Sequence, residues 1–171
     1  MDFFEAAAKR YSHRANYTNA PVPEADLVKI VTAGLQAPSG GNKQTTDFII
    51  VTNPDIRREL SNILVCDAIR TAPAIIVGLT KYDPFDFGLA FEVEDYSAAV
   101  QNILLAATAL GYASCWFDGT TRLDGRDKKM ATLLGVAENY SVRTLLPIGV
   151  PENHGLPASR KPFSERVRWV R

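Results

Sequence analysis

The chain has 171 residues, of which 46% are hydrophobic and 22% charged, the ordinary balance of a globular domain that buries a core. Its 19 Lys and Arg residues equal its 19 Asp and Glu residues in number, so nucleic acid is not an expected partner. Two cysteines lack metal-ligand spacing, and no apolar run is long enough for a bilayer. We therefore expect a single cytoplasmic domain over residues 1–171, with no metal site and no membrane partner.

Hydrophobic spacing and turn residues divide the chain into interspersed helices and strands without a steady strand–helix–strand rhythm. This pattern predicts an α+β layer fold around a mixed sheet. We expect an acidic, aromatic excursion at residues 81–94 and an extended, basic tail from Pro151. The predicted helices cover residues 2–9, 24–36, 53–64, 95–111 and 128–134, and the predicted strands cover residues 47–52, 74–79, 112–117 and 143–150.

The fourth predicted helix, which begins at Asp95 or Ser97 and ends at Gly111, is apolar on nearly every side. Such a helix is buried all round, either inside the domain or at an interface between subunits. The apolar residues near the end of the tail, Val167 and Trp169, also favour contact with a partner surface.

The stretch Arg10-Tyr11-Ser12-His13-Arg14 follows the first helix and combines two guanidinium groups with a hydroxyl. A guanidinium offers two parallel N–H groups to an oxyanion, and the serine adds a third donor, so the set suits a phosphate. A helix that ends in solvated arginines is the simpler interpretation, because most charge clusters lie on the surface. The local pattern leaves both interpretations open.

The loop Pro38 to Gln44 is neither a P-loop nor a GxGxxG motif, so it does not predict a nucleotide site of either class. Its polar side chains, Ser39, Asn42 and Gln44, offer both donors and acceptors, and its glycines would let a flat ligand approach the backbone. That mixture suits the edge of a heteroaromatic ring. A plain loop that ends the preceding helix is the alternative.

Five motifs, in order from residue 3 to the C-terminus, resemble the FMN-dependent nitroreductases. They are Arg10-Tyr11-Ser12-His13-Arg14; Ala37-Pro38-Ser39-Gly40-Gly41-Asn42-Lys43-Gln44; the helix from Asp95 to Gly111 with Ala113-Ser114-Cys115-Trp116; Leu146-Pro147-Ile148-Gly149-Val150-Pro151; and Arg160-Lys161-Pro162-Phe163-Ser164-Glu165 through Trp169. The resemblance implies a three-layer α-β-α fold around a mixed, mainly antiparallel sheet. It also implies a C-terminal arm that reaches the other subunit.

The resemblance further implies a homodimer with one FMN at each end of its interface. No catalytic side chain is implied, because the chemistry occurs at the flavin nitrogen N5. The implied ligands of the FMN phosphate are Arg10, Ser12, Arg14 and Arg160. The ring and ribityl chain would contact Pro38, Ser39, Gly40 and Asn42 of the other subunit, with Gln44 as a neighbour. The backbone of Phe117 and Asp118 would face N5.

By the same resemblance, NADH or NADPH would give hydride to FMN, and a nitroaromatic, a quinone or a similar small molecule would take the electrons. Three departures from the family pattern motivate alternatives. Thr45-Thr46 replaces the usual Pro-Trp, Ala158 stands where a lysine is frequent, and the segment before the apolar helix is short. An FMN-binding protein without turnover, a flavin-handling or redox-sensing protein, or a scaffold without flavin are the alternatives.

Overall fold

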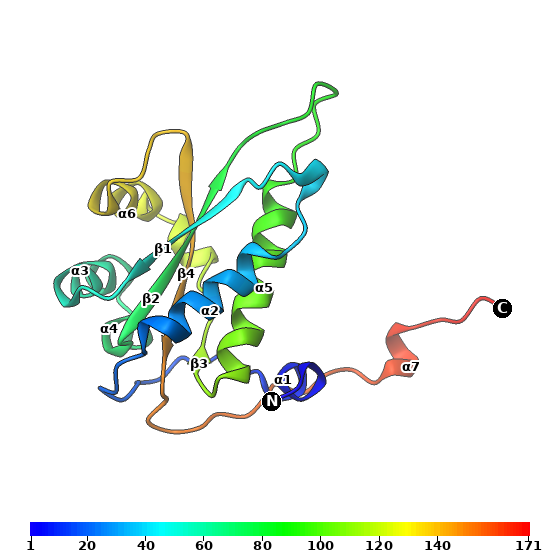
Figure 1. Cartoon of the computed structure of the whole chain (residues 1–171), viewed down its shortest axis with the longest axis horizontal. Helices are drawn as coiled ribbons and strands as arrows, with labels where there is room; N and C mark the ends of the chain where they lie inside the picture. The colour runs from blue at the N-terminus through cyan, green and yellow to red at the C-terminus, as the bar shows by residue number, and fades with distance from the viewer.

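The computed structural model describes all 171 residues as a four-stranded sheet covered by helices on both faces (Figure 1). The strand order is β1-β2-β4-β3, and every pair of neighbouring strands is antiparallel. The helices are α1 Phe3–Lys9, α2 Glu24–Leu35, α3 Pro54–Leu64, α4 Asp67–Thr71, α5 Glu92–Ala109, α6 Arg126–Leu134 and α7 Phe163–Arg166, the 3-10 helices are η1 Gly40–Asn42 and η2 Gly119–Arg122, and the strands are β1 Thr46–Val51, β2 Ala74–Lys81, β3 Ala113–Ser114 and β4 Tyr140–Gly149.

The central strands β2 and β4 send alternate side chains into two separate cores. On β2, Ile76 packs with α2 and α5, whereas Ile75 and Val77 pack with α3, α4 and α6, and all three are fully buried. Figure 1 shows the same division, with α2 and α5 on one face of the sheet and α3, α4 and α6 on the other. The predicted three-layer α-β-α arrangement is confirmed. All four strands are antiparallel to their neighbours, so the sheet is not mixed as predicted, and the only parallel pairing is an isolated bridge between Ser12 and Ser114 outside the strands.

Helix α5 begins at Glu92, so the predicted start at Asp95 or Ser97 is wrong. Acidic residues in the first turn stabilise the positive end of the helix dipole, which explains why the acidic segment continues into the helix. The helix buries Val100 and Ile103 completely, but Leu110 at its end is 39% exposed. Complete burial inside one chain is therefore wrong, and an interface between subunits remains the expectation. None of the helices combines the length and apolar character needed to cross a bilayer.

The strand predicted at residues 112–117 is reduced to β3, with a separate bridge between Phe117 and Leu145. The register of β3 on β4, continued toward this bridge, places Cys115 opposite Pro147. Proline has no N–H to donate, so the ladder is broken at this point. The prediction of a continuous strand was wrong because it read the apolar pattern of one strand without its partner.

After Pro151 the chain leaves the body of the molecule as a largely extended tail, as predicted, apart from the single turn of α7. Figure 1 shows the tail passing α1 and projecting away from the sheet. Its apolar side chains lie in solvent within the single chain: Leu156 is 87% exposed and Trp169 is 69% exposed. Contact between this tail and another subunit stays a prediction.

Candidate functional site

The stretch from Arg10 to Arg14 lies across the short strand β3. Arg10 caps the end of α1, Ser12 forms the parallel bridge with Ser114, and the His13 N–H donates to the Ser114 carbonyl at 2.9 Å. The arginines themselves are almost free. Arg10 has no ion pair or side-chain hydrogen bond, and Arg14 reaches only the Ser12 carbonyl at 3.5 Å. The backbone is thus fixed while two guanidinium groups keep their donors available.

Cys115 follows Ser114, the residue that anchors this stretch, and is buried, with 1% of its surface exposed. Burial raises the pKa of this thiol, while the charge of Arg14, a hydrogen bond with Ser12 and the charge of Arg10 pull the same pKa down. The donors of Arg10, Ser12 and Arg14 thus stand on one short backbone segment that is fixed against β3, which suits a phosphate.

The loop from Pro38 to Gln44 lies at the other end of α5. The buried carboxylate of Asp95, in the first turn of α5, accepts the Gly40 N–H at 2.8 Å and the Thr45 hydroxyl at 2.7 Å. Tyr11, by contrast, borders a hollow with residues at the C-terminal end of α5. Because α5 has 18 residues, its ends are about 27 Å apart. One chain therefore holds the two predicted half-sites well apart.

The glycines of this loop make room for aromatic side chains of the same chain. A Cβ atom on Gly40 would lie 2.6 Å from the Phe91 ring, and one on Gly41 would collide with Phe85. The approach of a flat ligand was the predicted reason for these glycines. On this face of the loop that reason is wrong, because phenylalanine rings of residues 82–91 fill the space.

The loop is held rigidly in a strained conformation. Gly41, Asn42 and Gln44 all have positive φ, at 56°, 56° and 50°, and such residues persist only where their surroundings hold them. Lys43 supplies part of that hold, because its ammonium donates to the Asp83 carboxylate at 3.1 Å and also to two backbone carbonyls.

The outer edge of the loop remains accessible. Pro38, Asn42 and Gln44 are exposed, and the Asn42 side chain makes no hydrogen bond within the chain. The Ser39 hydroxyl accepts the Gln44 N–H at 3.0 Å. The edge therefore leaves the Asn42 amide available to a ligand, and contact with the edge of a polar ring stays a prediction.

The predicted backbone contact at Phe117 and Asp118 can be narrowed to one of the two amides. The Phe117 N–H donates to the Leu145 carbonyl at 3.0 Å, and the Phe117 carbonyl accepts from Leu145 and from the Thr144 hydroxyl. Phe117 thus has no N–H left for a ligand. The Asp118 N–H has no acceptor within the chain, so it is the available donor.

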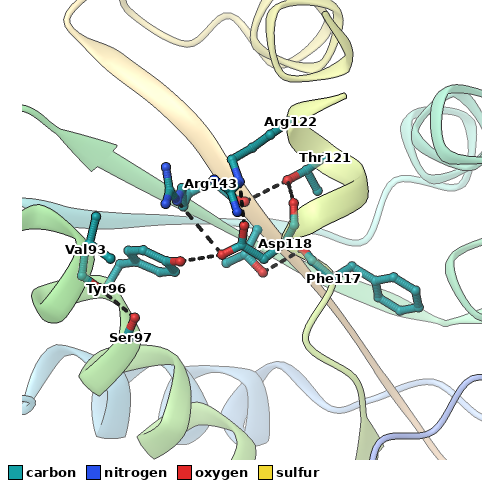
Figure 2. A network of polar contacts seen from close by, with 9 residues as sticks. Val93, Tyr96, Ser97, Phe117, Asp118, Thr121, Arg122 and Arg143 are labelled. Atoms are coloured by element: carbon teal, nitrogen blue, oxygen red, sulfur yellow. Dashed lines mark hydrogen bonds and ion pairs between the residues drawn. The ribbon is translucent and has the colours of Figure 1, made fainter. Parts of the chain in front are cut away.

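Figure 2 shows that the Asp118 carboxylate is the centre of a polar network. It accepts a short hydrogen bond from the Tyr96 hydroxyl, and its oxygens lie 2.8 Å from Arg122 Nε and 3.9 Å from Arg143 Nε. The guanidinium of Arg143 also lies over the Tyr96 ring, 5.0 Å from its centroid. The sequence prediction missed Tyr96, Arg122 and Arg143. An arginine within a run of buried strand residues was the signal that could have indicated Arg143.

Three buried polar atoms on residues 11–116, in the segments that carry the arginines and lead to Asp118, test whether FMN fits here. The Tyr11 hydroxyl, the Ser114 hydroxyl and the Trp116 indole N–H have no hydrogen-bond partner. An unpartnered buried donor costs about 1–3 kcal/mol, so such groups are rare unless a ligand or partner satisfies them. Together with the free guanidiniums, they fit a ligand that has a phosphate at one end and a polar ring at the other.

Arg160, like the loop from Pro38 to Gln44, is not brought to the arginines by its own chain. It lies in the exposed tail, where its guanidinium donates only to the carbonyls of Ala158 and Ser159, both at 3.1 Å. A role for Arg160 at the phosphate stays a prediction.

Known proteins similar to this chain agree with the resemblance. The sequence model of the Nitroreductase family matches residues 7–69 and 64–150. A relative from Archaeoglobus fulgidus, provisionally named NADH dehydrogenase/NAD(P)H nitroreductase, is 34% identical over 143 residues, 80% of this chain and 79% of that protein. The solved FMN-dependent nitroreductase of Clostridium difficile is 28% identical, with a TM-score of 0.84 and coverage of 97% and 98%. The nitroreductase of Bacteroides fragilis, solved with bound FMN, is also 28% identical, with a TM-score of 0.81 over 100% of both chains.

Proposed function

Because the chain belongs to the nitroreductase family, we propose that it is an FMN-dependent oxidoreductase that uses NADH or NADPH. It transfers hydride from the nicotinamide to FMN and passes the electrons to a nitroaromatic, a quinone or a similar small acceptor. The observation that carries this proposal is the set of donors left without an acceptor, on the guanidinium groups of Arg10 and Arg14 and on the Asp118 N–H. FMN, when bound, supplies the redox chemistry, so the chain needs no nucleophile or acid–base pair of its own.

The residues that offer these donors have separate roles in this proposal. Arg10, Ser12 and Arg14 hold the phosphate with charge-assisted hydrogen bonds. Ser114 and Trp116 contribute the next donors along the ligand. The Asp118 N–H, which has no acceptor within the chain, would be the donor available to N5.

A second copy of the chain completes the site in this proposal. Pro38, Ser39, Gly40, Asn42 and Gln44 lie too far along α5 to meet the arginines of their own chain, so we assign them to the FMN held by the partner. Gly40 contributes backbone surface only, since Asp95 already accepts its N–H. The apolar groove between α1, α2 and α5, together with the exposed rings of Phe3 and Phe4, offers an interface for the dimer.

The replacement Thr45-Thr46 does not favour the alternative of a protein without turnover. The Thr45 hydroxyl donates to Asp95, so this residue anchors the loop. A cytoplasmic location remains part of the proposal, because two free cysteines suit a reducing compartment.

The absorption spectrum of the purified protein, titrated with FMN, tests the proposal first. We expect a visible flavin band that shifts on binding and that bleaches rapidly when NADH or NADPH is added without oxygen. Addition of nitrobenzene or a quinone should restore the band. A bound flavin that neither nucleotide reduces would favour the alternative without turnover, and a protein that never binds FMN would contradict both.

A further inference from the structure

Arg143 occupies a β-bulge in the central strand β4. Along β2, Gly78 pairs with Thr144, and the next residue, Leu79, pairs with Val142. Arg143 therefore has no partner on β2. A bulge of this kind inserts one residue and redirects a side chain, and bulges are frequent beside active sites.

The bulge determines which face of the sheet Arg143 reaches. Val142 and Leu145 both lie in the core beneath α3 and α6. Strict alternation back from Leu145 would direct Arg143 into that apolar core, where an unpaired charge is very costly. With the extra residue, Val142 takes that place, and Arg143 lies over Tyr96 of α5 instead.

In this position the guanidinium of Arg143 lacks hydrogen-bond partners within the chain. It donates no hydrogen bond within the chain, its Nε atom is buried and unpaired, and the nearest carboxylate oxygen is 3.9 Å away on Asp118. Arg122 makes one close contact, from Nε to the same carboxylate. The side chains of Arg143 and Arg122 are 23% and 50% exposed, so solvent and ligands can reach both.

One carboxylate therefore faces two guanidinium groups, which leaves a net positive charge beside the free Asp118 N–H (Figure 2). A guanidinium with unused parallel N–H groups binds a planar carboxylate in a bidentate manner. The missing partner is thus an oxyanion, supplied by a molecule that enters next to the flavin position.

We propose that Arg143, assisted by Arg122, is a subsite that binds the carboxylate of an aromatic electron acceptor. The inference rests on the proposed function and narrows its substrate class to anionic acceptors. Arg143 is the principal ligand, since the bulge fixes its position, whereas the Arg122 side chain is more exposed.

Two acceptors that differ only in charge test this subsite, para-nitrobenzoate and para-nitrobenzamide. Both are measured as kcat/KM with wild type, Arg143→Met and the control Arg58→Met, which removes an exposed arginine of α3 on the opposite face. A charge-assisted pair at a partly buried site predicts a preference for the benzoate of about tenfold or more. Arg143→Met should abolish this preference, chiefly through KM for the benzoate, whereas the control Arg58→Met should keep the preference of the wild type.

A binding measurement separates failure of the subsite from failure of the proposed function. Calorimetry should detect benzoate, but not benzamide, on wild type, and the signal should vanish in Arg143→Met and weaken in Arg122→Met. This result does not depend on turnover. Equal use of both acceptors by the wild type would overturn the subsite while the oxidoreductase proposal stands. A change in the KM for NADH alone, with the acceptor ratio preserved, would also overturn it, because the oxyanion would then belong to the nucleotide.

Discussion

Lys43 and the pair formed by Arg10 and Arg14 carry the same sign of charge in very different surroundings. The ammonium of Lys43 is bound to the Asp83 carboxylate and to the carbonyls of Asp83 and Pro84, and it lies 4.4 Å from the centroid of the Phe85 ring. The two arginines have no carboxylate partner. A cationic side chain whose hydrogen bonds are all made within its own chain stabilises the local fold. A cationic side chain that has no carboxylate partner and stands on a fixed backbone is available to a ligand.

The strongest test of this comparison removes both arginines. Each charge-assisted hydrogen bond contributes about 1.5–3 kcal/mol, so Arg10→Ala combined with Arg14→Ala should weaken FMN binding by about 100-fold or more. The melting temperature without FMN should change little, because neither guanidinium stabilises the fold. Fluorescence titration with FMN measures the effect, and Arg58→Ala serves as the control. Unchanged FMN affinity in the double variant would show that Arg10 and Arg14 are solvated surface residues and do not bind the FMN phosphate.

The second test removes the anchor of the other region. Asp95→Ala leaves the Gly40 N–H and the Thr45 hydroxyl without an acceptor, and it should lower the free energy of unfolding by about 2–4 kcal/mol. Urea denaturation measures this change. Thr45→Val should lose roughly half as much, and Thr45→Ser should retain most of the stability because it keeps the hydroxyl. If Asp95→Ala were as stable as wild type, the loop would not depend on this carboxylate.

The smallest effect is expected at Lys43. Lys43→Met removes the tie to residues 82–91, and since the pair is partly exposed, the loss of unfolding free energy should be about 1 kcal/mol. Limited proteolysis should show faster cleavage within residues 82–91. FMN affinity should fall far less than in the double arginine variant. An equal loss of affinity would erase the distinction between the saturated and the unpaired cations.

Local sequence signals predicted most elements of the fold. Asp2 caps α1 and Asn53 caps α3 through side-chain hydrogen bonds, and the apolar β-branched residues of β2 form the buried central strand. The errors arose where the structure of a segment depends on residues elsewhere in the chain or on the properties of the helix end. The ladder opposite Cys115 fails because of Pro147, which lies 32 residues further along the chain, and the start of α5 depends on acidic residues that the composition assigned to a loop.

The candidate site was predicted from motifs that lie far apart in the sequence, and the comparison with known proteins confirms the family that the five motifs indicated. Sequence alone could not reveal that Asp95 uses the Gly40 N–H, or that Leu145 uses the Phe117 N–H, because both pairings are distant in the chain. The cluster around Asp118 was missed for a related reason. A bulge is an offset in the register between two strands, so it cannot be predicted from the residues of one strand alone.

The bulge at Arg143 also has an evolutionary consequence. Its neighbours pair with β2, Thr144 with Gly78 and Val142 with Leu79, whereas the residue at position 143 has no partner on that strand. Selection can therefore replace this residue, and with it the charge beside Asp118, without redesigning the sheet. Descendants of one ancestral chain could diverge in the molecules they accept through a single codon, while inheriting the same scaffold.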